Sequence, residues 1–195
     1  MHMATNILIA FYSRNGSAEA LAKAIAEGAQ AEGAEVRLRR ARELVEAEIV
    51  DRVPGWRESM ERQNALYHPP TVEDVEWADA LILGAPTRFG IIASELKAFI
   101  DGLGGLWFQG KLFNKVGAAF SATASPHGGA EMTIIGLYAV LSQMGLIIVP
   151  NGYGDIHLAP DAGLIVLFPC WMEHYVEPHD SDETRIVIAF NALAG

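Results

Sequence analysis

Apolar and polar positions along the chain follow two patterns, one typical of strands and one typical of helices. Near-continuous apolar runs, typical of strands covered on both faces, occur at residues 6–12, 79–85, 115–122 and 146–150. Residues 35–41 alternate between apolar and polar side chains and predict one more exposed strand. The segments between these strands favour helices, which we expect over residues 17–31, 93–102 and 131–143. Five strands separated by helices predict a parallel α/β sheet with right-handed crossovers.

This alternation of strands and helices also predicts where a ligand would lie. Five such strands are typical of the doubly wound, flavodoxin-like fold, with strand order 2-1-3-4-5 and helices on both faces. Ligands of these folds lie outside the carboxyl ends of the strands, at the topological switch point. The informative loops are therefore those that follow buried strands. We expect a single domain over 1–195, with 43–74 as an insertion whose short helix ends at Pro69 and Pro70.

The first of these loops joins the first buried strand to the first helix. It consists of Ser13, Arg14, Asn15, Gly16, Ser17 and Ala18. A helix N-terminus offers unpaired N–H groups and a positive dipole end, and the hydroxyls, the amide and the glycine of the loop add donors and backbone freedom. The loop therefore suits a phosphate group. The alternative is an ordinary N-cap, because Ser and Asn favour that position in any helix.

The second and third loops suit a planar ring. The second consists of Pro86, Thr87, Arg88, Phe89 and Gly90, and we expect Pro86 to end the strand before it. The third contains Ser121, Ala122, Thr123, Ala124, Ser125, His127, Gly128 and Gly129. Donors for a pyrimidine edge and apolar cover for a ring face are what a flavin requires. A rigid turn and a flexible loop are the alternatives, but all three loops fall at one edge of the predicted sheet.

Composition narrows the classes of function. The chain has 195 residues, of which 51% are hydrophobic, and a net charge of −10 without a Lys/Arg-rich run. Binding to nucleic acid or to an anionic membrane needs a basic surface, so neither is expected. The single cysteine, Cys170, leaves no internal disulfide. Neither a signal peptide nor a run of ~18 apolar residues is recognisable, so we expect a cytoplasmic protein without a membrane span.

Two patterns that suggest other chemistry are incomplete. Residues 105–111 match the start of a P-loop, but Leu112 stands where the magnesium-binding hydroxyl belongs. Exposure of the aromatic residues in this segment would indicate a subunit interface or a substrate wall. Cys170 and His174 are four residues apart, but a packed thiol is more common than a metal ligand, so no metal is expected.

Several segments together give the chain a family resemblance. PTRFG at 86–90, the stretch from Phe99 through GGLW to Gly110, the SATASPHGGAE loop and LIIVPNGY resemble WrbA-type flavodoxin-like NAD(P)H:quinone oxidoreductases, also called tryptophan-repressor-binding proteins. The resemblance implies an FMN-dependent enzyme that forms a homo-oligomer, a dimer or more usually a tetramer. It implies that the first loop binds the FMN phosphate and that the other two flank the flavin ring. It also implies substrate contacts from Trp107 and Tyr153.

The chain departs from the family pattern at three places. Met144 stands where family members often carry a histidine that contacts the flavin, and Asn15 replaces an aromatic residue often found in the phosphate loop. The family's Gly-Thr-Pro-Tyr-Gly-Ala stretch is missing, and residues 156–195 diverge. The departures leave the role of this C-terminal segment and the stacking of a nicotinamide ring open.

The expected reaction is a two-electron, ping-pong reduction of a quinone to a quinol. NADH or NADPH would give a hydride to FMN, and a quinone would then occupy the same slot. His127 is a candidate proton donor, because an unperturbed histidine has a pKa near ~6.5. Two other functions remain open: a flavodoxin-type one-electron carrier, and a non-enzymatic FMN-binding regulatory or scaffold protein. The sequence does not indicate a preference between NADH and NADPH.

Overall fold

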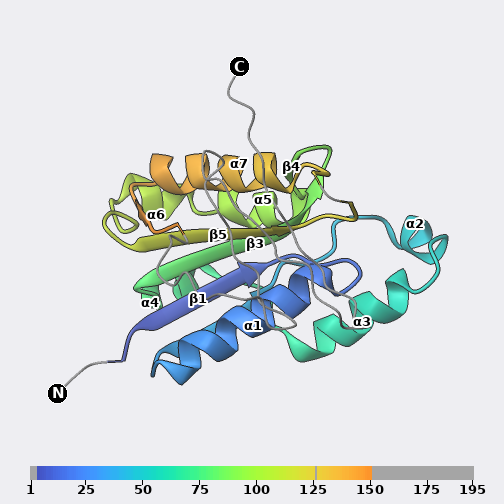
Figure 1. The fold of residues 1–195 in the computed structure, drawn as a ribbon, viewed down its shortest axis with the longest axis horizontal. Helices are drawn as coiled ribbons and strands as arrows, with labels where there is room; N and C mark the ends of the chain where they lie inside the picture. The colour runs from blue at the N-terminus through green and yellow to red at the C-terminus, as the bar shows by residue number, and fades with distance from the viewer. Residues whose placement is uncertain (1–3, 126, 151–195) are drawn as a thin grey trace, which may run out of the picture.

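Parallel strands form the central layer of the fold (Figure 1). The computed structural model of the protein describes residues 4–125 and 127–150. The parallel strands lie side by side in the order β2 (Glu35–Arg40), β1 (Asn6–Phe11), β3 (Ala80–Arg88), β5 (Val116–Ala122) and β6 (Ile147–Ile148). The predicted parallel, doubly wound sheet is confirmed. The predicted count of five strands was wrong, because a short strand, β4 (Ile91–Ile92), pairs antiparallel with the end of β3.

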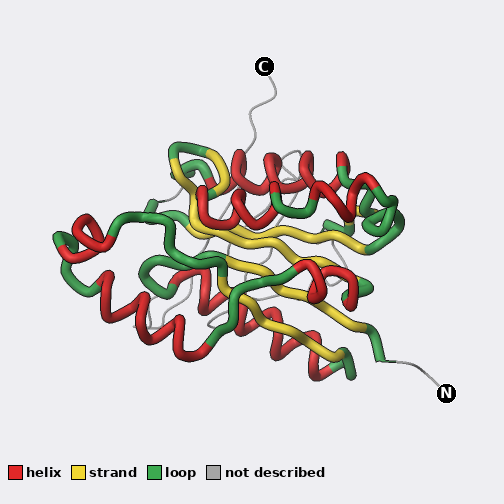
Figure 2. The backbone as a smooth tube through the Cα atoms, turned by 180° about the vertical axis from the view of Figure 1, so that it is seen from behind, coloured by secondary structure: helices red, strands yellow, loops and turns green. Residues whose placement is uncertain are grey.

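Helices cover both faces of the sheet, as Figure 2 shows from behind. They are α1 (Ser17–Ala31), α2 (Ala47–Asp51), α3 (Trp56–Leu66), α4 (Val72–Trp77), α5 (Ser94–Asp101), α6 (Gly104–Phe108) and α7 (Ala130–Gln143). Successive strand residues point to opposite faces, so Phe11 of β1 packs with Ala22 of α1, whereas Leu8 belongs to the core shared with Leu96 of α5 and Leu137 of α7. The near-continuous apolar runs are explained by this double burial.

Strand β3 is longer than predicted because Pro86 does not end it. The strand continues to Arg88, and Pro86 remains paired in register with Ala122 of β5. On the other side of β3, the register with β1 already ends at the pair Phe11–Gly84. No ladder on that side needs a donor from residue 86, so the missing N–H group of proline breaks nothing.

The segment 43–74 contains more structure than the one short helix predicted there. It holds α2, α3 and the start of α4, and α3 ends at Leu66, before the two prolines. Helix α4 begins at a complete capping box, in which the Thr71 hydroxyl accepts from the backbone N–H of Asp74 and the Asp74 carboxylate accepts from that of Thr71. Helix α3 reaches the back of the first predicted loop, where Ser59 donates to the carbonyl of Arg14.

Candidate cofactor-binding site

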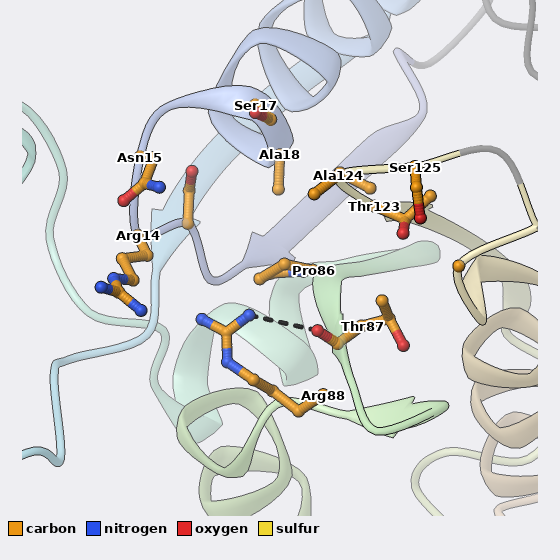
Figure 3. Close-up of a pocket in the computed structure, with 13 residues that line it drawn as sticks. Arg14, Asn15, Ser17, Ala18, Pro86, Thr87, Arg88, Thr123, Ala124 and Ser125 are labelled. Carbon is orange, nitrogen blue, oxygen red and sulfur yellow. Dashed lines mark hydrogen bonds between the residues drawn. The ribbon is translucent and has the colours of Figure 1, made fainter.

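A cavity of about 360 Å³ opens at the carboxyl ends of β1, β3 and β5 (Figure 3). All three predicted loops contribute to its lining, with Ser13, Arg14, Asn15, Ser17 and Ala18 from the first, Pro86, Thr87 and Arg88 from the second, and Ala122, Thr123, Ala124, Ser125 and Gly128 from the third. Its volume lies within the range of small-molecule sites, roughly 300–1,000 Å³. The structure thus brings together, at one rim of the sheet, loops that are more than a hundred residues apart.

Other predicted site residues lie beside the cavity rather than in its lining. These are Gly16, Phe89, Gly90, Ser121, His127 and Gly129. Phe89 is fully exposed, and Ser121 is buried with its hydroxyl donating to the carbonyl of Ala85. His127 is half exposed, with its Nδ1 atom 3.1 Å from Oε1 of Glu131. Its catalytic role stays a prediction.

The two predicted substrate contacts have different outcomes. Trp107 lies at the opposite end of α7 from the cavity, since its Nε1 atom donates to the carbonyl of Gln143 while α7 begins next to Gly129. A helix of this length spans roughly 20 Å, so Trp107 reaches a cavity only if that cavity belongs to a neighbouring subunit. Tyr153 lies outside the described residues, as does the 156–195 segment with Cys170 and His174.

The first loop leaves the start of α1 open. Gly16 is the N-cap, in a left-handed conformation (φ 96°), and among the described residues no side chain caps the first turn. The Ser13 hydroxyl, a candidate cap by sequence, accepts from the backbone N–H of Gly16 instead (3.0 Å). The N–H groups of the first turn therefore remain available where Ser17 and Ala18 line the cavity.

A buried arginine holds the first loop from behind. Arg40 of β2 is only 2% exposed, and its Nη2 atom donates to the carbonyl of Ser13 (3.1 Å). Its Nε atom donates to Oε1 of Gln63 (3.1 Å) and its Nη1 atom to Oδ1 of Asn64 (2.9 Å), both on α3. Burial lowers the pKa of Arg40, but a guanidinium stays protonated in proteins. The arginine thereby links β2, α3 and the loop.

A second buried cluster lies beneath the same loop. The Tyr12 hydroxyl (2.7 Å) and the Trp56 indole N–H (2.9 Å) both donate to Oε2 of Glu43. Burial opposes ionisation of Glu43, but hydrogen bonds from Tyr12, Glu95 and Trp56 hold its pKa below the usual value. Burial and the hydrogen bond to Glu43 raise the pKa of Tyr12 above its ordinary value. Glu43 is therefore the charged acceptor on which Trp56 and Tyr12 are fixed.

The second and third loops are joined by threonine hydroxyls. The Thr87 hydroxyl donates to the carbonyl of Gly129 (3.2 Å) and accepts from the backbone N–H of Gly90 (3.2 Å). Thr133 of α7, which is fully buried, donates to the Thr87 hydroxyl (2.9 Å). Gly129 has a positive φ (97°), and a Cβ atom there would lie 3.0 Å from Cα of Gly90. Only glycine lets the two loops approach this closely.

Comparison with known proteins identifies the family. A family model described as NADPH-dependent FMN reductase matches residues 4–161. The chain belongs to the NADPH-dependent FMN reductase family. One relative, NAD(P)H dehydrogenase (quinone) 3 of Rhizobium meliloti, is 45% identical over 149 residues, which cover 76% of this chain and 68% of the relative. Another, NAD(P)H dehydrogenase (quinone) of Deinococcus radiodurans, is 40% identical over 149 residues, covering 76% and 74%.

Solved structures agree with this family assignment. A WrbA-like flavodoxin from Agrobacterium tumefaciens superimposes with a TM-score of 0.56 and 27% identity, covering 77% of this chain and 80% of that one. Flavodoxin 2 from Bacillus cereus, with a TM-score of 0.51 and 22% identity over 74% of this chain and 80% of that one, shares the fold. The expected resemblance to WrbA-type flavodoxin-like proteins is confirmed.

The C-terminal part of the reductase chain matches a different model. A model described as a putative 2OG-Fe(II) oxygenase matches residues 152–191, which lie outside the described residues. The expectation of a single domain over 1–195 therefore stays a prediction. Within 4–125 and 127–150, no helix combines the length and the apolar character needed to cross a bilayer. In the same residues, His, Cys, Asp and Glu side chains form no cluster that could hold a metal ion.

Proposed function

We propose that the protein is an FMN-dependent NAD(P)H:quinone oxidoreductase that reduces a quinone to a quinol in two-electron, ping-pong cycles. The observation that carries the proposal is the open first turn of α1, which faces a cavity bounded by all three loops. A helix start without a side-chain cap suits a phosphate group, and the cavity beside it has room for a ring. The names of the relatives, which describe quinone dehydrogenases that use NAD(P)H, support the activity.

The residues present fit FMN. The first-turn N–H groups and the loop from Ser13 to Ala18 would hold the phosphate group. Pro86, Thr87 and Arg88 would flank one side of the flavin ring, and the loop from Ala122 to Gly128 the other. Gly16, Gly90, Ser121 and Gly129 would shape these loops rather than contact the ring, and exposed Phe89 would supply apolar cover.

The protein's contribution to the reaction is position and electrostatics. When bound, FMN supplies the capacity to accept a hydride from NADH or NADPH and to pass electrons to a quinone. Backbone and side-chain donors along the second and third loops would stabilise the negative charge that develops on reduction. Both reactants are flat, so one slot can take each in turn, which is the physical basis of ping-pong kinetics. The contact of His127 Nδ1 with Glu131 leaves Nε2 as the atom that would donate a proton.

A spectroscopic experiment tests the cofactor and the activity together. The protein is mixed with FMN, desalted and examined for absorbance near ~450 nm, then mixed anaerobically with NADH or NADPH and, after bleaching, with a quinone. We expect retained flavin, bleaching by the nicotinamide and recovery by the quinone. Flavin that stays oxidised would favour a one-electron carrier. A protein that retains no FMN would favour a scaffold.

A variant at the start of α1 tests the phosphate position. Ser17→Asp places a carboxylate on the first residue of α1, where it favours the helix but repels a phosphate. We expect FMN affinity to fall by about tenfold or more, with riboflavin affinity unchanged because riboflavin lacks the phosphate. Ser17→Ala is the control for loss of the hydroxyl. Equal loss of both ligands in Ser17→Asp would contradict the assignment.

A further inference from the structure

Two guanidinium groups line the same side of the cavity. Arg14 extends from the first loop and Arg88 from the second, and in Figure 3 their guanidinium groups point toward one another. Arg14 points away from Ser17 and Ala18, where the open turn of α1 begins. Among the described residues, no carboxylate oxygen lies within the 4.0 Å ion-pair limit of either arginine. Within the described residues the pair is therefore uncompensated, although the net charge of the chain is −10.

Among the described residues, stacking rather than a hydrogen bond holds the Arg14 side chain in place. Its guanidinium carbon lies 3.9 Å from the centre of the Trp56 ring, and Trp56 is itself buried and anchored to Glu43. Stacking on an aromatic face fixes the plane of a guanidinium and leaves its N–H edge free. The Nε atom of Arg14 is buried and has no acceptor in the part of the chain that the structure describes. A buried donor without a partner calls for an explanation, and an anion bound beside the arginine would supply one.

Among the described residues, only one nitrogen atom of the Arg88 guanidinium group has a hydrogen-bond partner. Its Nη1 atom donates to the carbonyl of Thr87 (3.1 Å), which turns the side chain along the cavity wall (Figure 3). Two like charges that point toward each other on one wall of a cavity repel, and an anion between them removes the repulsion. Planar guanidinium groups match the geometry of phosphate oxygens.

We propose that Arg14 and Arg88 form a second anion position that binds a phosphate group of the nicotinamide dinucleotide, either its pyrophosphate or the 2′-phosphate of NADPH. The inference rests on the proposed function. There the FMN phosphate already occupies the start of α1, and neither a quinone nor a flavin ring carries a phosphate. Of the proposed ligands, only the dinucleotide brings another phosphate into the cavity.

Binding of nucleotide fragments to the FMN-loaded protein tests this position without turnover. The probes for calorimetry are 2′,5′-ADP, which carries the 2′-phosphate, 5′-ADP, which carries the diphosphate, and adenosine, which carries neither. The variants are Arg14→Gln, which removes the charge, and Arg14→Lys, which keeps it. Arg52→Gln is the control, because Arg52 is exposed, pairs with Glu48 and lies outside the cavity lining.

We expect one fragment to bind the wild type at least tenfold more tightly than adenosine does. Arg14→Gln should abolish that difference, Arg14→Lys should keep part of it, and Arg52→Gln should leave it unchanged. Preference for 2′,5′-ADP identifies the 2′-phosphate, and preference for 5′-ADP the pyrophosphate. If Arg14→Gln weakens FMN but not riboflavin and leaves fragment binding unchanged, Arg14 belongs to the FMN phosphate cradle and the proposal is wrong. Equal binding of all three fragments also overturns it. Failure to reduce a quinone would count only against the proposed function, whereas failure to retain FMN would refute both.

Discussion

At the scale of single residues, the site depends on buried side chains that the ligand would never touch. Arg40 fixes the carbonyl of Ser13, and Ser59 donates to the carbonyl of Arg14 (2.9 Å). These bonds occupy the carbonyl side of the first loop and leave the N–H groups of the first turn of α1 free, whereas the N–H group of Gly16 donates to the Ser13 hydroxyl. The loop is therefore shaped before any ligand arrives, which lowers the entropic cost of binding.

Replacing Arg40 tests this preorganisation. Arg40→Met keeps much of the buried volume but leaves the Ser13 carbonyl and the Gln63 and Asn64 amides without their donor. We expect the free energy of unfolding to fall by about 2–4 kcal/mol, measured by urea denaturation without FMN. Arg42→Met, at an exposed neighbouring position, is the control. A loss below about 1 kcal/mol would show that the loop does not depend on Arg40.

Sequence patterns revealed the residues of the loops but not those that hold them. Ser17, Thr87 and Ser125 could be predicted because each follows a buried apolar run in an α/β rhythm. Arg40 and Thr133 could not, because their partners are far away in the chain and no local pattern marks a buried arginine. The prediction that Pro86 ends its strand was wrong for a related reason. Whether a proline ends a strand depends on whether the neighbouring strand on its N–H side is still paired at that position.

At the scale of elements, the cavity is closed by contacts between loops and the helices that follow them. Helices α1 and α7 both begin after a glycine with positive φ, and both first turns lie next to the cavity. The hydroxyl of Thr133, in the first turn of α7, ties that helix to the second loop through Thr87. This tie sets the spacing between the second and third loops.

Removing the Thr133 hydroxyl should loosen this spacing. Thr133→Val keeps the branched shape but removes the donor to the partly buried Thr87 hydroxyl. We expect a loss of about 1–3 kcal/mol in unfolding free energy and faster hydrogen exchange at the Gly90 amide, which donates to Thr87. Ser142→Ala, an exposed hydroxyl on the same helix, should change neither. Unchanged exchange at Gly90 would argue against the tie.

The pairing of α1 with α3 should depend on pH. Glu19 of α1 accepts from Arg62 and from Tyr67 (2.9 Å), and the hydrogen bond from Arg62 is the main cause that lowers its pKa from 4.5. A lowered pKa means that the stabilisation is complete above the unfolded value and is lost as pH falls through the folded value. Glu19→Gln should therefore cost about 1–3 kcal/mol at pH 7 and progressively less below about pH 4.5. The control is Glu27→Gln, an exposed change on α1, in urea titrations across pH 7 to 3. A cost independent of pH would contradict the ion pair.

At the scale of the whole molecule, the exposed aromatic side chains other than Phe89 gather away from the cavity. Trp107, Phe108 and Phe113 form an aromatic patch at the C-terminal end of α7, where Trp107 donates to the Gln143 carbonyl and Phe113 lies against Gly145. Apolar surface of this kind marks a contact with another molecule. We propose that the patch is a contact between subunits of a homo-oligomer.

Charge placed in this patch should dissociate the assembly. Phe108 is 86% exposed, so Phe108→Glu adds a charge with little effect on the fold of one subunit, but a closed interface cannot bury that charge cheaply. We expect light scattering after size exclusion to give an oligomer for the wild type and a smaller species for the variant. Leu66→Glu, at another exposed apolar position, is the control. A monomeric wild type would refute the proposal.

The anchoring of the first loop by α3 limits how this reductase can be engineered. Three side chains of α3, those of Ser59, Gln63 and Asn64, reach the loop directly or through Arg40. Grafting residues 13–18 alone onto another flavodoxin-like scaffold would transfer the sequence of the loop without the side chains of α3 that hold it in place. A successful transplant would have to carry the helix along, so the two segments constitute one exchangeable module although Arg14 and Ser59, which join them, are 45 positions apart.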